Sequence, residues 1–252
     1  VVETIDVKAS DLLTGLDVTD LSVSGGRLHI ANGINGFQSA DLSSPTSPTI
    51  HRRVEETRSY DSVQTDGQTI IAGNGHVIDL SSSVPAIADE IAAVARAQAF
   101  TFHDGIVFGA SDELEIVDLG DGTQLGSASI PDGTIPTAIE QQGALVFIAT
   151  RDENNLANNQ LLVYDVSDHA NPTLLASPVV ATKPINAIVS EGNLVLAVNG
   201  AWGSSGEGLI AIDVTDPSTP SVVSTYDTGG ISTDIFLRNS IAYVTDRLDG
   251  FR

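Results

Sequence analysis

The chain of 252 residues contains no cysteine and no methionine, and only 5% of its residues are aromatic. The absence of cysteine excludes disulfide bridges, thiolate nucleophiles and cysteine-ligated metal sites. No run of about 18 apolar residues occurs, so the sequence predicts no membrane-spanning helix. Lysine is scarce too, since Lys8 and Lys183 are the only two. Hydrophobic residues still make up 41% of the chain, which is enough to build a core.

Acidic residues outnumber basic residues by 33 to 11, which gives a formal net charge of -22 at pH 7. Such a surface repels phosphate backbones and anionic lipids, so neither nucleic acid nor a membrane is an expected partner. The acid-rich, lysine-poor composition resembles that of halophilic proteins and of extracellular proteins that meet calcium. An ordinary acidic bacterial protein is the alternative interpretation. The composition leaves the oligomeric state open.

One short pattern recurs along the chain. Five copies end in a short stretch followed by Asp and then Leu or Val, with these anchor aspartates at Asp41, Asp79, Asp118, Asp165 and Asp213. The anchor aspartates are spaced 38, 39, 47 and 48 residues apart. A period near 40 indicates that each copy is one supersecondary unit, which buries its apolar faces by stacking against its neighbours.

Each copy reads as four short strands. A turn residue separates the first strand from a second, near-continuous apolar strand, as in Leu194–Val198. The third strand ends at the anchor aspartate, and in three copies a proline-bearing turn leads to the fourth strand. Four antiparallel strands per repeat are typical of a β-propeller. We interpret the anchor aspartates as structural, with carboxylates that accept backbone N–H bonds in the following turn.

These copies resemble the LVIVD repeat. The fifth copy carries the resemblance best, through Gly208–Pro220 and the stretch Tyr226–Gly230. The resemblance implies a β-propeller in a secreted, periplasmic or cell-surface protein. It implies no agreed activity and no catalytic motif, so no functional residue is transferred from the family to this chain.

We therefore expect an all-β chain that folds as a single β-propeller domain over residues 1–252, with four-stranded antiparallel blades. The repeats are approximately 16–58, 59–95, 96–134, 135–183, 184–230, and 231–252 together with 1–15. This division predicts six blades, with seven as the alternative. It also predicts that pairing of the N-terminal and C-terminal segments closes the ring, because closure removes unpaired strand edges.

The longer loops of the fourth and fifth copies form the first candidate site. In the fourth copy, Asp152, Glu153, Asn154 and Asn155 offer oxygen ligands that suit a hard cation, so calcium is the candidate cofactor. In the fifth copy, Trp202 is the only tryptophan and is flanked by glycine-rich sequence; an exposed ring there would stack on a sugar or a peptide proline. The alternative is two solvated loops, with Trp202 folded onto neighbouring blades.

Three aspartates form the second candidate site. Asp20 and Asp234 stand five residues before the turn residue of their copies, and Asp61 stands six before it. In a six-bladed ring these copies are consecutive, so the three carboxylates would converge near the channel entrance. Converging carboxylates bind a cation or a cationic ligand, or perform acid–base chemistry. The alternative is that they are solvated or turn-capping residues.

The sequence contains no nucleophile elbow, no phosphate-binding loop and no His-Glu-x-x-His motif. It therefore favours a non-catalytic interaction or scaffold module, with a protein or carbohydrate ligand and structural calcium. One alternative is a propeller enzyme, a hydrolase or lyase with the acidic site at the channel mouth. Another is an accessory subunit of a larger extracellular assembly.

Overall fold

The computed structural model describes residues 18–34, 36–44, 49–54, 60, 62–65, 69–73, 75–79, 86–155, 157–200, 208–247 and 250–251. The chain divides into two compact units, Val1–Arg96 and Ala97–Arg252. The described residues form β-strands with one short helix, α1 (Ala92–Arg96), so the all-β class is confirmed. Within these residues no helix has the length and apolar character needed to cross a membrane.

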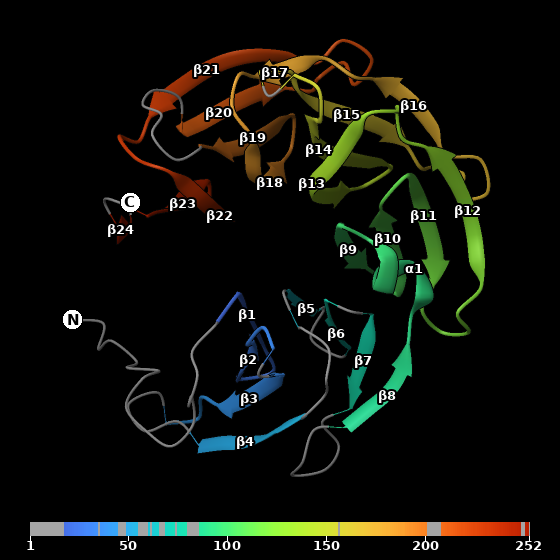
Figure 1. Cartoon of the computed structure of the whole chain (residues 1–252), viewed down its shortest axis with the longest axis vertical. Coiled ribbons are helices and arrows are strands. Elements are labelled where there is room, and N and C mark those ends of the chain that lie inside the picture. The colour runs from blue at the N-terminus through green and yellow to red at the C-terminus, as the bar shows by residue number, and fades with distance from the viewer. Residues whose placement is uncertain are drawn as a thin grey trace. The chain divides into compact units, whose positions relative to one another are not determined.

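The first unit holds two four-stranded antiparallel sheets, each with its strands in chain order (Figure 1). The first sheet consists of β1 (Asp20–Ser24), β2 (Arg27–Ala31), β3 (Phe37–Asp41) and β4 (Thr49–Val54). The second consists of β5 (Val63–Thr65), β6 (Ile70–Ala72), β7 (His76–Asp79) and β8 (Ala86–Glu90). This meander of four strands is the blade predicted from the repeat.

The second unit holds four antiparallel sheets, of four, five, four and three strands. The first consists of β9 (Ala99–His103), β10 (Ile106–Ala110), β11 (Glu113–Asp118) and β12 (Gln124–Ser129). The next consists of β13 (Thr134–Gln142), β14 (Leu145–Asp152), β15 (Asn159–Asp165) and β16 (Thr173–Ala176), with β17 (Val179–Ala181) also paired to β15. The third consists of β18 (Ile185–Glu191), β19 (Leu194–Asn199), β20 (Gly208–Asp213) and β21 (Ser221–Asp227). The last consists of β22 (Ser232–Arg238), β23 (Ile241–Asp246) and β24 (Gly250–Phe251).

The cores of the second unit lie between successive blades. Along β14, Val146 and Ile148 pack towards Phe108 of the preceding blade, whereas Phe147 packs towards Val195 of the following blade. The central strands therefore bury both faces, which explains why their sequences are continuous apolar runs rather than alternating ones. The inner strands β9, β13, β18 and β22 consequently lie next to one another in chain order (Figure 1).

The number of complete blades differs from the prediction. Among the described residues, five sheets have the four strands of a complete blade, and the sheet β22–β23–β24 has three. The structure thus shows five complete blades, not six or seven, because no described strand supplies the outer edge of the last sheet. The strand predicted for that place, within residues 1–15, lies outside the described residues, so closure by the two terminal segments stays a prediction.

Candidate functional site

The inner strands of three neighbouring blades share an irregularity near their first residues. The pairing register shifts between Pro136 and Ala138 in β13, between Ile185 and Ala187 in β18, and between Ser232 and Asp234 in β22. Each shift is a β-bulge, which leaves one extra residue out of the ladder and redirects its side chain. The extra residues are Thr137, Asn186 and Thr233.

Hydrogen bonds hold these bulged side chains in place. Thr137 Oγ1 donates to the carbonyl oxygen of Ala149 over 3.2 Å, on the adjacent strand of its own blade. Asn186 Nδ2 donates to the carbonyl oxygen of Ser232 over 2.7 Å, and thereby ties β18 to the first residue of β22 in the next blade. No described residue donates to the amide oxygen of Asn186, so this oxygen can accept a hydrogen bond from a ligand.

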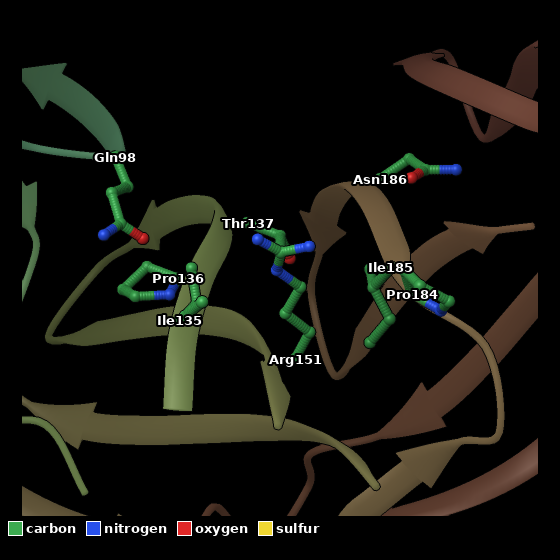
Figure 2. Close-up of a pocket in the computed structure, with 8 residues that line it drawn as sticks. All are labelled: Gln98, Ile135, Pro136, Thr137, Arg151, Pro184, Ile185 and Asn186. Carbon is green, nitrogen blue, oxygen red and sulfur yellow. The ribbon is translucent and has the colours of Figure 1, made fainter. Parts of the chain in front are cut away.

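A cavity of about 490 Å³ opens beside these bulges (Figure 2). Its lining comes from three successive blades: Gln98 before β9, Ile135, Pro136, Thr137 and Arg151 from β13 and β14, and Pro184, Ile185 and Asn186 at the start of β18. Half of these side chains are apolar and half are polar. A concave site with an apolar wall and a few fixed polar groups has the usual form of a small-molecule site.

Arg151 supplies the charge of this cavity. Its side chain extends between the β13 and β18 walls, with the guanidinium near Thr137 (Figure 2). The guanidinium makes no hydrogen bond or ion pair with any other described residue, and the residue is exposed. The neighbouring carboxylate of Asp152 is engaged by Asn158 Nδ2 over 2.7 Å instead. In a chain with 33 acidic and 11 basic residues, an arginine without an acidic partner is unexpected.

The predicted calcium ligands lie in the loop after Arg151. Asp152 Oδ1 accepts the backbone N–H groups of Asn154 and Asn155 over 2.8 and 3.1 Å, and Asn155 Oδ1 accepts that of Ala157 over 3.2 Å. The hydrogen bond from Asn158, and then that from the backbone of Asn154, lower the pKa of Asp152. These oxygens therefore organise the loop. Among the described residues no three His, Asp or Glu side chains gather as metal ligands, and calcium bound with Glu153 and its neighbours stays a prediction.

The structure describes only two of the three aspartates of the predicted acidic site. Asp20 Oδ1 accepts the N–H of Leu21 over 2.8 Å, and Asp20 Oδ2 accepts that of Val63 over 2.9 Å, which joins β1 to β5. Asp234 Oδ1 accepts the N–H of Ile235 over 2.9 Å, and partial desolvation raises the pKa of Asp234. Asp20 belongs to the first unit and Asp234 to the second, while Asp61 and Trp202 lie outside the described residues. Their roles in ligand binding stay predictions.

The structural interpretation of the anchor aspartates is confirmed where the following turn is described. In each case Oδ1 accepts the backbone N–H two residues later, over 2.7–2.8 Å: Asp41 from Ser43, Asp118 from Gly120, Asp165 from Ser167, and Asp213 from Thr215. The hydrogen bond from the Ser167 backbone lowers the pKa of Asp165. These carboxylates therefore close the turns that follow their strands.

Sequence reasoning missed every residue of the Arg151 cavity. The lining residues are separated by up to 88 positions, from Gln98 to Asn186, and no motif connects them. One clue was present, because a basic residue near the end of a buried strand stands out in so acidic a chain. The second clue was proline at the start of two inner strands, Pro136 and Pro184, where an irregular ladder is expected.

The blade topology and the pattern of bulged inner strands define a β-propeller. Solved structures confirm this class at low sequence identity. The computationally designed Ika8 protein matches with a TM-score of 0.66 and 14% identity, over 93% of this chain and 69% of that chain. BamB from Moraxella catarrhalis matches with a TM-score of 0.61 and 13% identity, over 92% and 67%. The Cps50 (Swd1) β-propeller domain of Myceliophteria thermophila matches with a TM-score of 0.69 and 15% identity, over 93% and 82%.

One model of a known repeat family matches the sequence. The LVIVD repeat model matches residues 15–56, 155–178 and 203–228, so the predicted resemblance is confirmed. The chain therefore carries LVIVD repeats within a β-propeller fold. A comparison with curated proteins finds no match. The matched segments contain β1–β4, β15, β16, β20 and β21 in full. They leave outside the cavity-lining residues, which stand at positions 98, 135–137, 151 and 184–186.

Proposed function

We propose that this propeller is a non-catalytic binding module that takes its ligand in the Arg151 cavity. The observation that carries the proposal is the cavity of about 490 Å³, built on the bulged starts of β13 and β18 and on the segment before β9. A volume in this range accommodates a small molecule or a few residues of a peptide or glycan. The bulged side chains are already fixed by hydrogen bonds, so binding requires little ordering of the protein.

The chemistry of the lining supports binding rather than catalysis. Thr137 is the one hydroxyl in the lining, and it donates to a backbone carbonyl rather than to a base. A hydroxyl nucleophile requires an adjacent general base, and the described part of the lining contains no carboxylate or imidazole. The enzyme alternative has one supporting observation, the raised pKa of Asp234, which is the property of a general acid.

A ligand screen with one blocking variant tests the proposal. Gln98 is an exposed cavity-lining residue, so Gln98→Trp should fill part of the cavity without disturbing a core. Gln124→Trp places the same bulk on the exposed first residue of β12 as a matched control. Glycans, peptides and small organic ions that bind the wild type should lose affinity in Gln98→Trp and keep it in Gln124→Trp. If every ligand found binds Gln98→Trp as tightly as the wild type, the proposal is wrong.

We also propose that the protein acts outside the cytoplasm, in a secreted, periplasmic or cell-surface setting. The support is the acidic, lysine-poor composition together with the LVIVD repeats. Solved propellers with this fold include BamB and the Cps50 (Swd1) domain, so an accessory role in an assembly is compatible with the architecture. Cell fractionation with detection of the native protein tests the location; recovery in the cytoplasm alone would contradict it.

A further inference from the structure

We infer that the Arg151 cavity binds its ligand through a carboxylate group, with the rest of the ligand on the apolar wall. The inference rests on the proposed function, since it specifies the ligand class of the same cavity. Arg151 carries a permanent positive charge and presents parallel N–H donors that match the two oxygens of a carboxylate. Its guanidinium has no partner among the described residues, so it can meet a ligand without first breaking an ion pair.

The surroundings of Arg151 strengthen such a contact. Ile135 and Pro184 are half-buried and form apolar walls on either side of the guanidinium, with the buried Pro136 and Ile185 behind them (Figure 2). A ligand seated there excludes water from the charge pair, which increases the electrostatic attraction between carboxylate and guanidinium. The apolar walls also favour an alkyl or aryl body attached to the carboxylate.

Neutral polar groups lie on either side of Arg151. Gln98 offers an amide from the β9 side of the cavity, and Asn186 offers its free amide oxygen from the β18 side (Figure 2). Because these groups carry no charge, they can orient polar atoms of the ligand body, and the ligand needs no second ionic group to bind them. The cavity thus has one cationic position and several neutral ones.

The charge of the whole chain limits the ligand to a single negative charge. A protein of formal net charge -22 repels anions at long range, and one guanidinium neutralises one charge. A phosphate monoester, which carries close to two charges at neutral pH, is therefore disfavoured relative to a carboxylate. The ligand class is a monocarboxylate with an apolar body.

Matched pairs of probes test this inference. Phenylpropionate and hexanoate would each be titrated against the protein alongside its own primary amide, with phenyl phosphate as a further probe, and binding followed by NMR chemical shifts. The carboxylates should bind at least tenfold more tightly than their amides, because a charge-assisted hydrogen-bond pair exceeds a neutral one by about 1.4 kcal/mol or more. The largest shifts should fall on Thr137, Arg151 and Asn186.

Two variants with the same change of charge separate local from long-range effects. Arg151→Gln should abolish the preference for carboxylate over amide, while Arg238→Gln should preserve it. Arg238 is an exposed arginine at the last residue of β22, the end of that strand remote from the bulge.

The outcomes distinguish the inference from the proposed function. If acid and amide bind the cavity equally, or if both variants lose the preference for carboxylate to the same extent, the inferred carboxylate recognition is wrong. The cavity would still be a binding site. Tighter binding of phenyl phosphate would overturn the ligand class. If no carboxylate binds the wild type, the inference is wrong; a neutral ligand that Gln98→Trp blocks would still uphold the proposed function.

Discussion

Protonation of His29 should destabilise the first unit in mild acid. His29 lies on β2 with 1% of its surface exposed, and its ring stacks on Phe37 at 6.1 Å between centroids. Its Nε2 is 3.0 Å from Ser24 Oγ, while Nδ1 is buried without a hydrogen-bond partner among the described residues. Burial, and then the charge of Arg27, lower the pKa of His29 from 6.5 to about 4.

The direction of the effect follows from this lowered pKa. The unfolded chain takes up the His29 proton near pH 6.5, whereas the folded chain resists it until about pH 4. The stability contributed by neutral His29 is therefore fully present above pH 6.5 and is lost as the pH falls towards 4. At pH 5 we expect a loss of about 1–2 kcal/mol in the free energy of unfolding, after allowance for solvent screening.

Chemical denaturation at pH 7 and pH 5 measures this loss. His29→Leu removes the titrating group, so its stability should fall less between the two pH values than that of the wild type. Leu28→Val, next to His29 on β2, is the control, because it changes packing without removing a titrating group and should leave the pH dependence unchanged. Hydrogen exchange at Ile30, beside His29 on β2, reports on the first unit itself. The same pH dependence in the wild type and in His29→Leu would refute the reasoning.

Two further predictions concern packing and burial in the second unit. A Cβ on Gly230 would collide with the carboxylate of Asp246, so Gly230→Ala should lower the free energy of unfolding by about 1–3 kcal/mol; an unchanged urea midpoint would contradict this. Burial raises the pKa of Glu140, whose Oε1 accepts a hydrogen bond from Ser190 Oγ over 3.3 Å. The cost of ionising Glu140 therefore grows as the pH rises from the ordinary glutamate pKa of 4.5 to the raised pKa of the folded chain. Glu140→Gln should thus raise the thermal midpoint at pH 7 and lose this advantage in acid below pH 4.5. A lower midpoint at pH 7 would show that the Glu140 carboxylate is stabilising.

The sequence predicted features whose physical causes are local. An anchor aspartate and the N–H that it binds are two residues apart, as in Asp165 and Ser167, so the turn can be read from a few positions. The sequence likewise indicated that both faces of β14 are buried, because Val146 and Phe147 belong to one uninterrupted apolar run. Strand order within a blade followed, since short turns force neighbouring strands to pair.

The cavity could not be predicted because residues far apart in the sequence form it. Gln98, Arg151 and Asn186 meet only after three blades have packed, and the bulges that turn Thr137 and Asn186 out of the ladder have no fixed sequence signature. The loop after Arg151 drew attention for its carboxylates, yet Asp152 uses them to bind its own backbone. The predicted blade number was also wrong, because a repeat count takes every copy as a full sheet, while β22–β24 form three strands.

A crystal structure of the protein soaked with phenylpropionate tests the central claim most directly. The account predicts electron density in the cavity between Gln98 and Asn186, with both carboxylate oxygens within hydrogen-bonding distance of the Arg151 guanidinium and the ring against Ile135 or Pro184. The same soak of Arg151→Gln should leave the cavity without the probe. Phenylpropionate bound on another surface while the wild-type cavity holds only water would contradict the account.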